Sequence, residues 1–404
     1  MAVALLCVIT GLSVYIMVHT DPKAVKHSPS APKQLALPKT NIAQTDGYGL
    51  PKSYSIAGNH IIDSGGNIFV PHGVNRSSTE WSCTGKSVDG SHAGVPASDF
   101  VTMHTKWKAN IVRIPLNQDM WLAGAAEYCP SYQATIGEEV QRAHQTGLRV
   151  ILDLHWSDAG NLSNSGACAV GTGGACVGQQ CMPDQNSLLF WQQVAAAYKT
   201  DQSTWFDLYN EPRNITWAIW RDGGNGGAAC NYTTVGMQQL VDAVRATGAN
   251  NIVLAGGLKS ASNLAGVPLL SGGNVAYSVH SYASYNNPDD WTIGGWDTEF
   301  GNRAKTVPVI ATEFGKIWCS GGVSRGSSTY DQAVLDYFRT HGIGYAAFSW
   351  FSYSCKFPTL IADSVGGCAN AGCLVEADLQ KFASGEQAMT IPGIKVPVQL
   401  PLSP

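Results

Sequence analysis

Eight short apolar runs, separated by segments with helical spacing, constrain this chain more than any other feature of its sequence. Each run has the length of a β-strand, and many end in a polar or aromatic residue. The runs lie at residues 68–74, 110–115, 149–155, 204–210, 251–256, 275–280, 307–313 and 344–350. The clearest helical segments lie between them at 97–108, 132–146, 187–200, 233–247 and 330–341. Apolar strands that alternate with helices predict a parallel sheet covered on its faces.

Eight strand–helix units favour a closed (β/α)8 barrel, the TIM-barrel fold, with enlarged loops. A doubly wound open sheet is the alternative, but no Gly-x-Gly-x-x-Gly motif follows the first run. Residues 54–62 and the turn at 64–66 predict a small N-terminal hairpin that closes the barrel floor. Gly147 and Gly248 stand where two helices are expected to end, since glycine tolerates the left-handed conformation found there.

The cysteines indicate an oxidising compartment. Ten of the eleven lie outside the N-terminal apolar segment, among Gly, Ser and Asn residues. No Cys-x2-Cys pair occurs, which argues against a structural zinc site. An even number of loop cysteines predicts disulfides, with scattered free thiols as the alternative. The pairing cannot be deduced from sequence, although Cys368 and Cys373 are close enough to form a small closed loop.

Composition divides the chain into a leader, a linker and one large domain. Residues 1–19 are expected to be a signal peptide or signal anchor, because residues 2–18 are uncharged and apolar. We expect a Pro/Lys/Ser-rich linker at 20–51, the catalytic barrel at 52–392 and an irregular tail at 393–404. The leader and the cysteines both predict a secreted protein, or one held at the membrane by residues 2–18 alone.

Charge and aromatic content exclude several classes. The chain has 25 Lys+Arg against 29 Asp+Glu and no basic run, which argues against a nucleic-acid partner. Its 12 Trp, 15 Tyr and 11 Phe exclude an intrinsically disordered chain. A polytopic membrane protein would need several long apolar spans, and only the N-terminus offers one. We expect a globular monomer.

The chemistry is expected where the strands end, because in such a barrel the carboxyl ends of the strands converge on one mouth. These ends carry two carboxylates, two imidazoles, a guanidinium, an amide, a phenol and an indole. The residues are Arg113, His155, Asn210, Glu211, His280, Tyr282, Glu313 and Trp350. Core packing does not produce such a set, since charged side chains are almost never fully buried unless paired.

Glu211 directly follows the fourth run and Glu313 ends the seventh, so the two would face each other across the mouth. Two carboxyls about 5 Å apart are what a retaining glycosidase needs. Neighbouring carboxyls cannot both ionise freely, so one is expected to keep its proton and act as the general acid. One alternative is a buried salt-bridge pair that braces the barrel. Another is a metal site with His155 and His280, although the charge of Arg113 opposes a cation.

Several motifs resemble family 5 of the glycoside hydrolases, the cellulase family. They are Asn210-Glu-Pro212, Thr312-Glu-Phe-Gly315, Trp350, Arg113 in Ile-Val-Arg-Ile-Pro, His155 in Leu-Asp-Leu-His-Trp, and His280-Ser-Tyr282. The resemblance covers residues 54–355, and all eight positions of the family's active-site set find a matching residue type in the right order.

This resemblance implies roles for the residues. Glu211 would be the acid/base and Glu313 the nucleophile, with Arg113 and Tyr282 holding Glu313 ionised and aimed. Asn210 would hydrogen-bond the sugar 2-hydroxyl.

The remaining expected roles concern imidazole and indole rings. His155 and His280 would bind sugar hydroxyls or hydrogen-bond the acid/base, and His155 alone could be a core histidine. Trp350 would form the floor of the −1 subsite, unless it is plain core. Trp156 and Trp318 are expected to line a glycan groove, because sugar rings stack on aromatic faces. The loop at 157–186 either shapes this groove or is a disulfide-tied surface excursion.

We therefore expect a retaining endo-β-1,4-glycan hydrolase without metal or organic cofactor, acting on a polysaccharide or oligosaccharide. Cellulose-like glucan is the first expected substrate because the resemblance points there. A β-mannanase or a β-1,3-glucanase would need the same eight residues. A catalytically silent glycan-binding barrel and a metal-dependent hydrolase are the alternatives from other functional classes.

Overall fold

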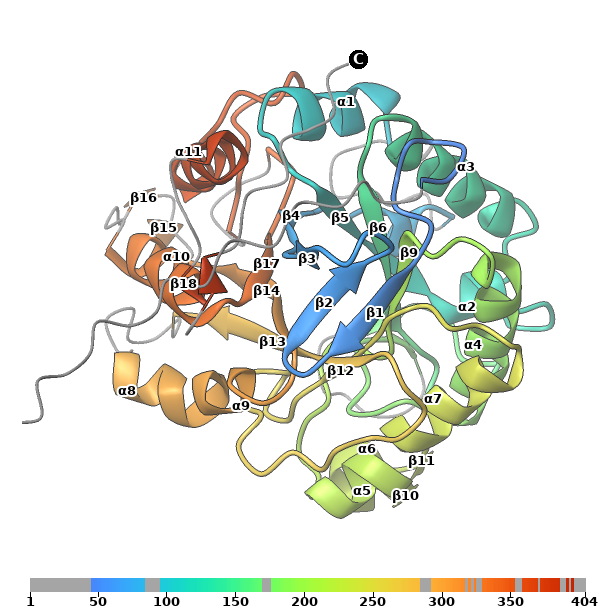
Figure 1. Ribbon diagram of the computed structural model, residues 1–404. Coiled ribbons are helices and arrows are strands. Elements are labelled where there is room, and N and C mark those ends of the chain that lie inside the picture. Colours follow the sequence, from blue (N-terminus) through green and yellow to red (C-terminus); the bar gives the residue numbers. More distant parts are fainter. Residues whose placement is uncertain are drawn as a thin grey trace, which may run out of the picture. The chain divides into compact units, whose positions relative to one another are not determined.

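A closed barrel of eight parallel strands, ringed by helices, forms the centre of the unit at residues 40–404 (Figure 1). The structure is a computed structural model that describes residues 45–83, 95–168, 176–283, 292–316, 319–320, 323–324, 329–352, 358–369, 371–385, 390–391 and 394–395. The barrel strands are β4 (His72–Asn75), β5 (Ile111–Asn117), β6 (Arg149–Trp156), β9 (Thr204–Asp207), β12 (Val253–Gly256), β13 (Val275–Tyr282), β14 (Val309–Gly315) and β17 (Gly344–Ala347). They follow one another in chain order, and β17 pairs with β4 to close the ring, which confirms the predicted (β/α)8 fold.

Each of the eight predicted runs overlaps one barrel strand, and the first run differs most from its prediction. It divides into β3 (Ile68–Phe69) and β4, with Val70 and Pro71 between them. Proline has no backbone N–H, so it cannot continue the hydrogen-bond ladder and separates the two strands.

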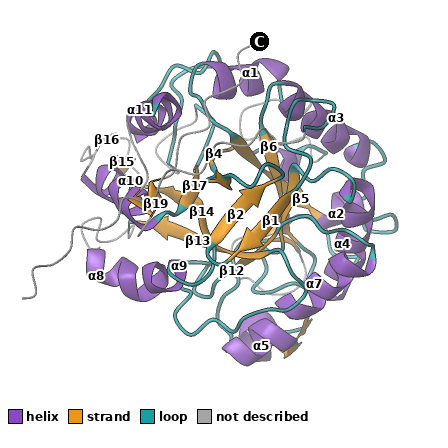
Figure 2. Cartoon of the chain, in the orientation of Figure 1, coloured by secondary structure: helices purple, strands orange, loops and turns teal. Residues whose placement is uncertain are grey.

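Helices cover the outside of the barrel, drawn in purple in Figure 2. The five predicted helices correspond to α1 (Ala97–Thr105), α3 (Tyr132–Gln145), α4 (Gln185–Tyr198), α7 (Met237–Ala246) and α10 (Thr329–His341). Gly147 and Gly248 follow α3 and α7 with φ of +96° and +84°, as their predicted role at helix ends requires. Asp184 begins α4 by accepting hydrogen bonds from the backbone N–H groups of Asn186 and Ser187.

The other elements are mostly short. The helical ones are η1 (Thr79–Trp81), α2 (Gln118–Trp121), α5 (Trp217–Asp222), α6 (Gly227–Cys230), α8 (Ile293–Trp296), η2 (Asp297–Gly301), α9 (Asn302–Ala304) and α11 (Ala371–Ser384). Small strand pairs are β7 (Ala167–Cys168) with β8 (Val177–Gly178), β10 (Gly224–Asn225) with β11 (Thr233–Thr234), β15 (Cys319–Ser320) with β16 (Val323–Ser324), and β18 (Thr390–Ile391) with β19 (Ile394–Lys395). Between β12 and β13 the chain forms a loop at residues 257–274 and no helix.

A small antiparallel sheet closes one end of the barrel. It consists of β1 (Tyr54–Ala57), β2 (His60–Asp63) and β3, so the predicted hairpin is present and gains a third strand. Tyr54 and Phe69 of this sheet pack edge to face on Trp205 inside the barrel. These residues share one apolar cluster with Ile111, Ile151, Leu254 and Ile310 from the barrel strands. Since the small sheet seals this end, the functional groups are expected at the opposite end, where the strands terminate.

Four disulfides join described residues: Cys83–Cys129, Cys168–Cys176, Cys181–Cys230 and Cys368–Cys373. The last is the pair expected from its spacing. The first three tie loops that follow β4, β5, β6 and β9. Cross-links in loops that follow barrel strands restrict the segments that surround the expected mouth.

The described helices offer no candidate for a membrane span, because none is both long and apolar enough. The expected leader at residues 1–19 and the tail at 393–404 fall outside the described residues, apart from the short strand β19. The boundaries proposed for leader, linker, barrel and tail therefore stay predictions.

Candidate active site

Seven of the eight predicted site residues form one connected network at the carboxyl ends of the strands. Glu313 lies at its centre, near the end of β14, with 4% of its surface exposed. Its Oε1 accepts a hydrogen bond from Nη1 of Arg113 over 2.7 Å, and its Oε2 accepts one from the hydroxyl of Tyr282 over 2.6 Å. Nδ1 of His280 lies 3.5 Å from Oε2. Both oxygens of the Glu313 carboxylate are thus held by donors.

These contacts control the ionisation of Glu313. Burial raises its pKa, but the charges of His280, Arg113 and His155 and the hydrogen bond from Tyr282 outweigh burial and lower the pKa to about 2. Glu313 is therefore a carboxylate throughout the mildly acidic and neutral range, and its direction is fixed by two donors, Tyr282 on the neighbouring strand β13 and Arg113 on β5.

Arg113 of β5 is fully buried below the mouth and organises the network. Its guanidinium lies 3.0 Å from carboxylate oxygens of Asp153 and Asp207, and it also donates to Oδ1 of Asn210 over 2.9 Å. Burial lowers the pKa of Arg113, but the three surrounding carboxylates raise it above its usual value, so the side chain stays charged. Asn75 at the end of β4 accepts a further hydrogen bond over 3.0 Å.

Sequence reasoning missed Asp153, Asp207 and Asn75. A signal for the two aspartates was present, because each interrupts an otherwise apolar strand run: Leu152-Asp-Leu154 and Phe206-Asp-Leu208. Asp153 is also two residues before His155, so both side chains lie on the same face of β6.

Glu211 follows β9 and lies beside Glu313. Its side chain is 17% exposed, and its Oε1 lies 3.1 Å from Nδ1 of His280. One oxygen of Glu211, one oxygen of Glu313 and a ring nitrogen of His280 all lie within 4.8 Å of one another. The two carboxyl groups are therefore close neighbours, although 102 positions separate them in the sequence.

His155 is held at both ring nitrogens. Its Nδ1 lies 2.6 Å from Oδ2 of Asp153, and its Nε2 lies 2.8 Å from the side-chain nitrogen of Gln179. Burial lowers the pKa of His155, but the charge and hydrogen bond of Asp153 outweigh it, and the net direction is upward. Gln179, in the loop after β6, was not among the predicted residues and carries no motif that would reveal it.

A comparison with protein families agrees with this geometry. Residues 66–354 match the family model described as cellulase, glycosyl hydrolase family 5. The chain belongs to glycosyl hydrolase family 5.

Solved structures share the barrel of this family-5 chain. The β-glucanase SdGluc5_26A from Saccharophagus degradans matches with a TM-score of 0.62 at 21% identity, covering 86% of this chain and 96% of that one. The catalytic domain of Thermobifida fusca endoglucanase Cel5A matches with a TM-score of 0.58 at 16% identity, covering 81% of this chain and 97% of that one. Identities this low show the fold alone. No curated protein matches the chain at a significant level.

Trp350 of this family-5 barrel does not lie where the resemblance implied. It is 1% exposed and packs edge to face on Trp107, with ring centroids 4.8 Å apart, in the apolar cluster around the outside of the barrel. A ring enclosed in this way cannot form the floor under a sugar. The structure therefore assigns Trp350 to the core, the alternative considered for it.

Phe348 is the aromatic residue at this strand end that approaches the network. Tyr345 and Ala347 of β17 belong to the outer cluster, so alternation along the strand directs Ala346 and Phe348 inward. The half-buried ring of Phe348 lies 6.4 Å from that of Tyr282, whose hydroxyl binds Glu313. Phe348 therefore lies beside the tyrosine that holds Glu313.

The predicted groove tryptophans differ in their positions. Trp156 is buried and packs edge to face on Trp81, with centroids 4.1 Å apart. Trp81 is partly exposed and lines a cleft of about 440 Å³ together with Glu127 and Tyr128. Trp156 is therefore not exposed to the cleft itself, but it packs against Trp81, which lines the cleft. Trp318 lies outside the described residues.

The close approach of Glu211, His280 and Glu313 is also compatible in distance with a metal site. Their surroundings fit a dication poorly. One oxygen of Glu313 is paired with the cationic Arg113, and the other accepts a hydrogen from Tyr282. A divalent ion would displace these donors and lie beside a buried guanidinium charge.

Proposed function

We propose that this family-5 hydrolase is a retaining, endo-acting β-1,4-glycan hydrolase in which Glu313 is the nucleophile and Glu211 the acid/base. The observation that carries this proposal is the pair of carboxyl groups with oxygens within 4.8 Å, one on β14 and one in the loop that follows β9. Retaining glycosidases separate their carboxyls by about 5–5.5 Å, whereas inverting enzymes leave about 6.5–9.5 Å for a water molecule. The short separation favours retention.

In the first step, Glu313 attacks the anomeric carbon while Glu211 gives its proton to the leaving glycosidic oxygen. The bond to the leaving sugar breaks, and an ester between the glycosyl unit and Glu313 forms. In the second step Glu211, now a carboxylate, takes a proton from water as the water oxygen attacks the same carbon and releases Glu313. The pKa of about 2 supports Glu313 in the role that needs a carboxylate from the start.

Asn210 supports the proposal through the direction of its amide. Its Oδ1 accepts a hydrogen from Arg113, so the side-chain nitrogen points its hydrogens elsewhere. This nitrogen is buried and has no partner among the described residues. A buried donor without an acceptor costs free energy, and a sugar 2-hydroxyl bound at this place would supply one.

A cellulose-like β-1,4-glucan is the substrate that the comparisons favour. The Saccharophagus degradans β-glucanase and the Thermobifida fusca endoglucanase are each described in complex with cellotetraose. The partly exposed rings of Trp81 and Tyr128 beside a cleft of about 440 Å³ suit the apolar faces of further sugar units. The four disulfides support secretion into an oxidising compartment.

Release of reducing ends from a panel of soluble glycans tests the proposal. The panel contains a β-1,4-glucan, a β-1,3-glucan, a β-mannan and a xylan, each with and without a chelator. We expect turnover of the β-1,4-glucan that the chelator does not change, with the β-anomer as the first product seen by NMR. Faster turnover of the mannan or the β-1,3-glucan would show that this glycan, and not the β-1,4-glucan, is the preferred substrate. An α-anomer would contradict retention, and binding without turnover would indicate a catalytically silent barrel.

A further inference from the structure

Arg213, two residues after Glu211, is a buried cation without an acidic partner among the described residues. It is 5% exposed, and no carboxylate of a described residue lies within ion-pair distance of its guanidinium. Its Nε is buried and makes no hydrogen bond to any described residue. Burying an unpaired charge is costly, and ordinary core packing does not call for a guanidinium at such a place.

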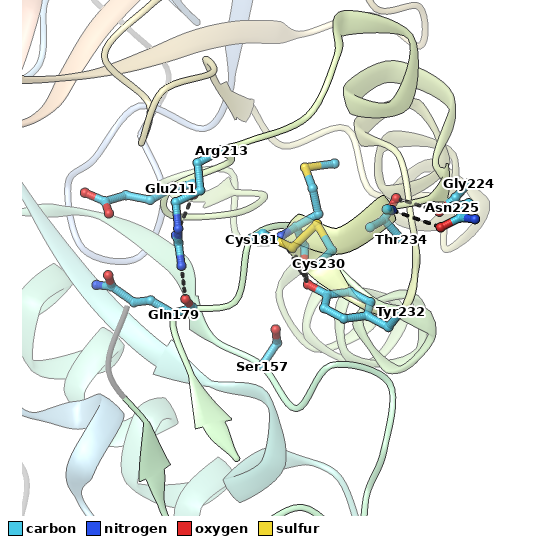
Figure 3. Close-up of a disulfide and its surroundings, with 12 residues drawn as sticks. Ser157, Gln179, Cys181, Glu211, Arg213, Gly224, Asn225, Cys230, Tyr232 and Thr234 are labelled. Carbon is cyan, nitrogen blue, oxygen red and sulfur yellow. Dashed lines mark hydrogen bonds between the residues drawn. A yellow bond between two sulfur atoms is a disulfide. The ribbon is translucent and has the colours of Figure 1, made fainter. Parts of the chain in front are cut away.

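The contacts of Arg213 are all with backbone carbonyl groups on two different segments (Figure 3). Nη1 donates to the carbonyl oxygen of Glu211 over 3.0 Å, and Nη2 donates to the carbonyl oxygen of Gln179. The backbone N–H of Arg213 donates to the carbonyl oxygen of Cys181 over 3.0 Å. One residue therefore joins the turn that carries Glu211 to the loop at residues 176–183.

This loop carries Gln179, which contacts a second site residue. The side-chain nitrogen of Gln179 lies 2.8 Å from Nε2 of His155. In the neutral ring of His155 the hydrogen on Nδ1 goes to Asp153, so Nε2 can accept a hydrogen from the Gln179 amide. Gln179 thus fixes the imidazole from the side opposite Asp153.

The loop at 176–183 is itself anchored at both ends. At its start, Gly178 exchanges two backbone hydrogen bonds with Ser157, of 2.9 and 3.0 Å, beside the end of β6. Near its end, the buried disulfide Cys181–Cys230 ties it to α6, as Figure 3 shows. The hydroxyl of Tyr232 accepts a hydrogen bond from the backbone N–H of Met182 over 3.1 Å and donates one to its carbonyl.

We propose that Arg213 and Gln179 are positioning residues of the hydrolytic site: Arg213 locks the Glu211 turn to the loop at 176–183, and Gln179 in that loop locks the ring of His155. The proposal rests on the function proposed above and adds two residues outside the eight identified from sequence. Neither residue acts on the sugar itself. Their effect is on where Glu211 and His155 stand, and a displacement of about 1 Å in such groups can cost about 100-fold in rate.

The first test replaces Arg213 and compares it with a matched arginine. Arg213→Met and Arg213→Lys remove the two-pronged contact, and Arg221→Met removes an exposed arginine of α5 that pairs with Asp222. We expect both Arg213 variants to lower kcat by about 10- to 100-fold with KM nearly unchanged, and Arg221→Met to leave kcat unchanged. A loss in the Arg213 variants that merely follows the fraction of unfolded protein would overturn the proposal.

The second test reads the ring of His155 without turnover, so its result does not depend on the proposed function. Gln179→Glu places an acceptor where the amide donates, and ring-nitrogen NMR shifts report which nitrogens of His155 carry hydrogen. Asp153 lies against the ring, and the charges of Glu80 and Glu313 also act on it. A second carboxylate should therefore favour the doubly protonated ring, and the pH midpoint of His155 should rise by about one unit. An unchanged midpoint and tautomer would show that Gln179 does not hold the ring.

Discussion

Tyr282 and Arg113 share the Glu313 carboxylate, and Tyr282 takes the oxygen that Arg113 leaves open: its hydroxyl donates to Oε2 over 2.6 Å. Tyr282 ends β13 and Glu313 lies near the end of β14, and these strands pair directly. The phenol thus comes from the neighbouring strand, and its contact is part of the barrel's own register. Two donors on opposite sides leave the carboxylate little freedom to rotate.

Removing the hydroxyl tests this relationship. Tyr282→Phe keeps the ring but takes away one donor, so Glu313 should be less firmly held and its pKa should rise from about 2 towards the ordinary range. We expect kcat to fall by about 10- to 100-fold. Because a raised pKa of the nucleophile removes activity from the acid side, the acidic limb of the kcat/KM profile should move to higher pH. Tyr277→Phe, which removes a hydroxyl bonded to backbone groups at residues 268 and 270, is the control. An acidic limb that stays in place would contradict the assignment.

Replacing the two glutamates should separate their roles. Glu313→Gln removes the nucleophile, and we expect turnover to fall by about four orders of magnitude or more on every substrate. Glu211→Gln removes the proton donor, so its loss should be smaller for an aryl glycoside whose leaving group needs no proton. Initial rates on a polysaccharide and on an aryl glycoside check this. Glu138→Gln, on the exposed face of α3, is the matched control. Equal losses on both substrates in the Glu211 variant would assign it another role.

The barrel could be predicted because its information is local. Each strand run is apolar in a stretch of strand length, and glycine stands where α3 and α7 end. The network at the mouth follows from the same information, since the carboxyl ends of all eight strands of a closed barrel converge on one mouth. This is why the sequence alone could predict that Arg113, Glu211 and Glu313 lie close together.

The sequence-based predictions were wrong or incomplete where tertiary contacts determine the position of a side chain. Strand β17 ends at Ala347, three residues before Trp350, and the chain then turns Trp350 outward onto Trp107. The residue pattern within the run does not predict this turn. Gln179 and Arg213 meet only because two loops fold against each other, so their contact leaves no sequence pattern.

Phe348 and Trp350 should therefore respond oppositely to mutation. Phe348→Ala opens the space beside Tyr282 and should raise KM or lower kcat by about 10-fold or more, with a modest loss of stability. Trp350→Phe leaves a cavity against Trp107 and should lower the free energy of unfolding by about 1–3 kcal/mol, while the folded fraction keeps nearly full activity. Thermal unfolding and steady-state kinetics on both variants measure this. If the Trp350 variant loses activity while remaining folded, Trp350 would be assigned to the floor of the −1 subsite, as the resemblance implied.

Asp119 is a buried acid whose surroundings in the folded protein disfavour its ionised form. It is 0% exposed, and neither of its carboxyl oxygens has a hydrogen-bond donor among the described residues. Burial, together with the charges of Asp158 and Asp184, raises its pKa to about 10. In the unfolded chain an aspartate titrates near 3.9. Between these two values the unfolded state releases a proton that the folded state retains, so the contribution of Asp119 to stability falls steadily as pH rises above about 4.

Asp119→Asn should consequently stabilise the protein at neutral pH. The amide cannot ionise, and it can donate to the carboxylate of Asp158 in place of the retained proton. We expect the free energy of unfolding to increase by about 1–3 kcal/mol near pH 7.5, with the gain shrinking to nothing below about pH 4, where both states keep the proton. Denaturant unfolding at several pH values measures this, with a substitution of the exposed Asp222 of α5, Asp222→Asn, as the control. A gain that is equal at pH 4 and pH 7.5 would mean that packing, and not the ionisation of Asp119, causes the change.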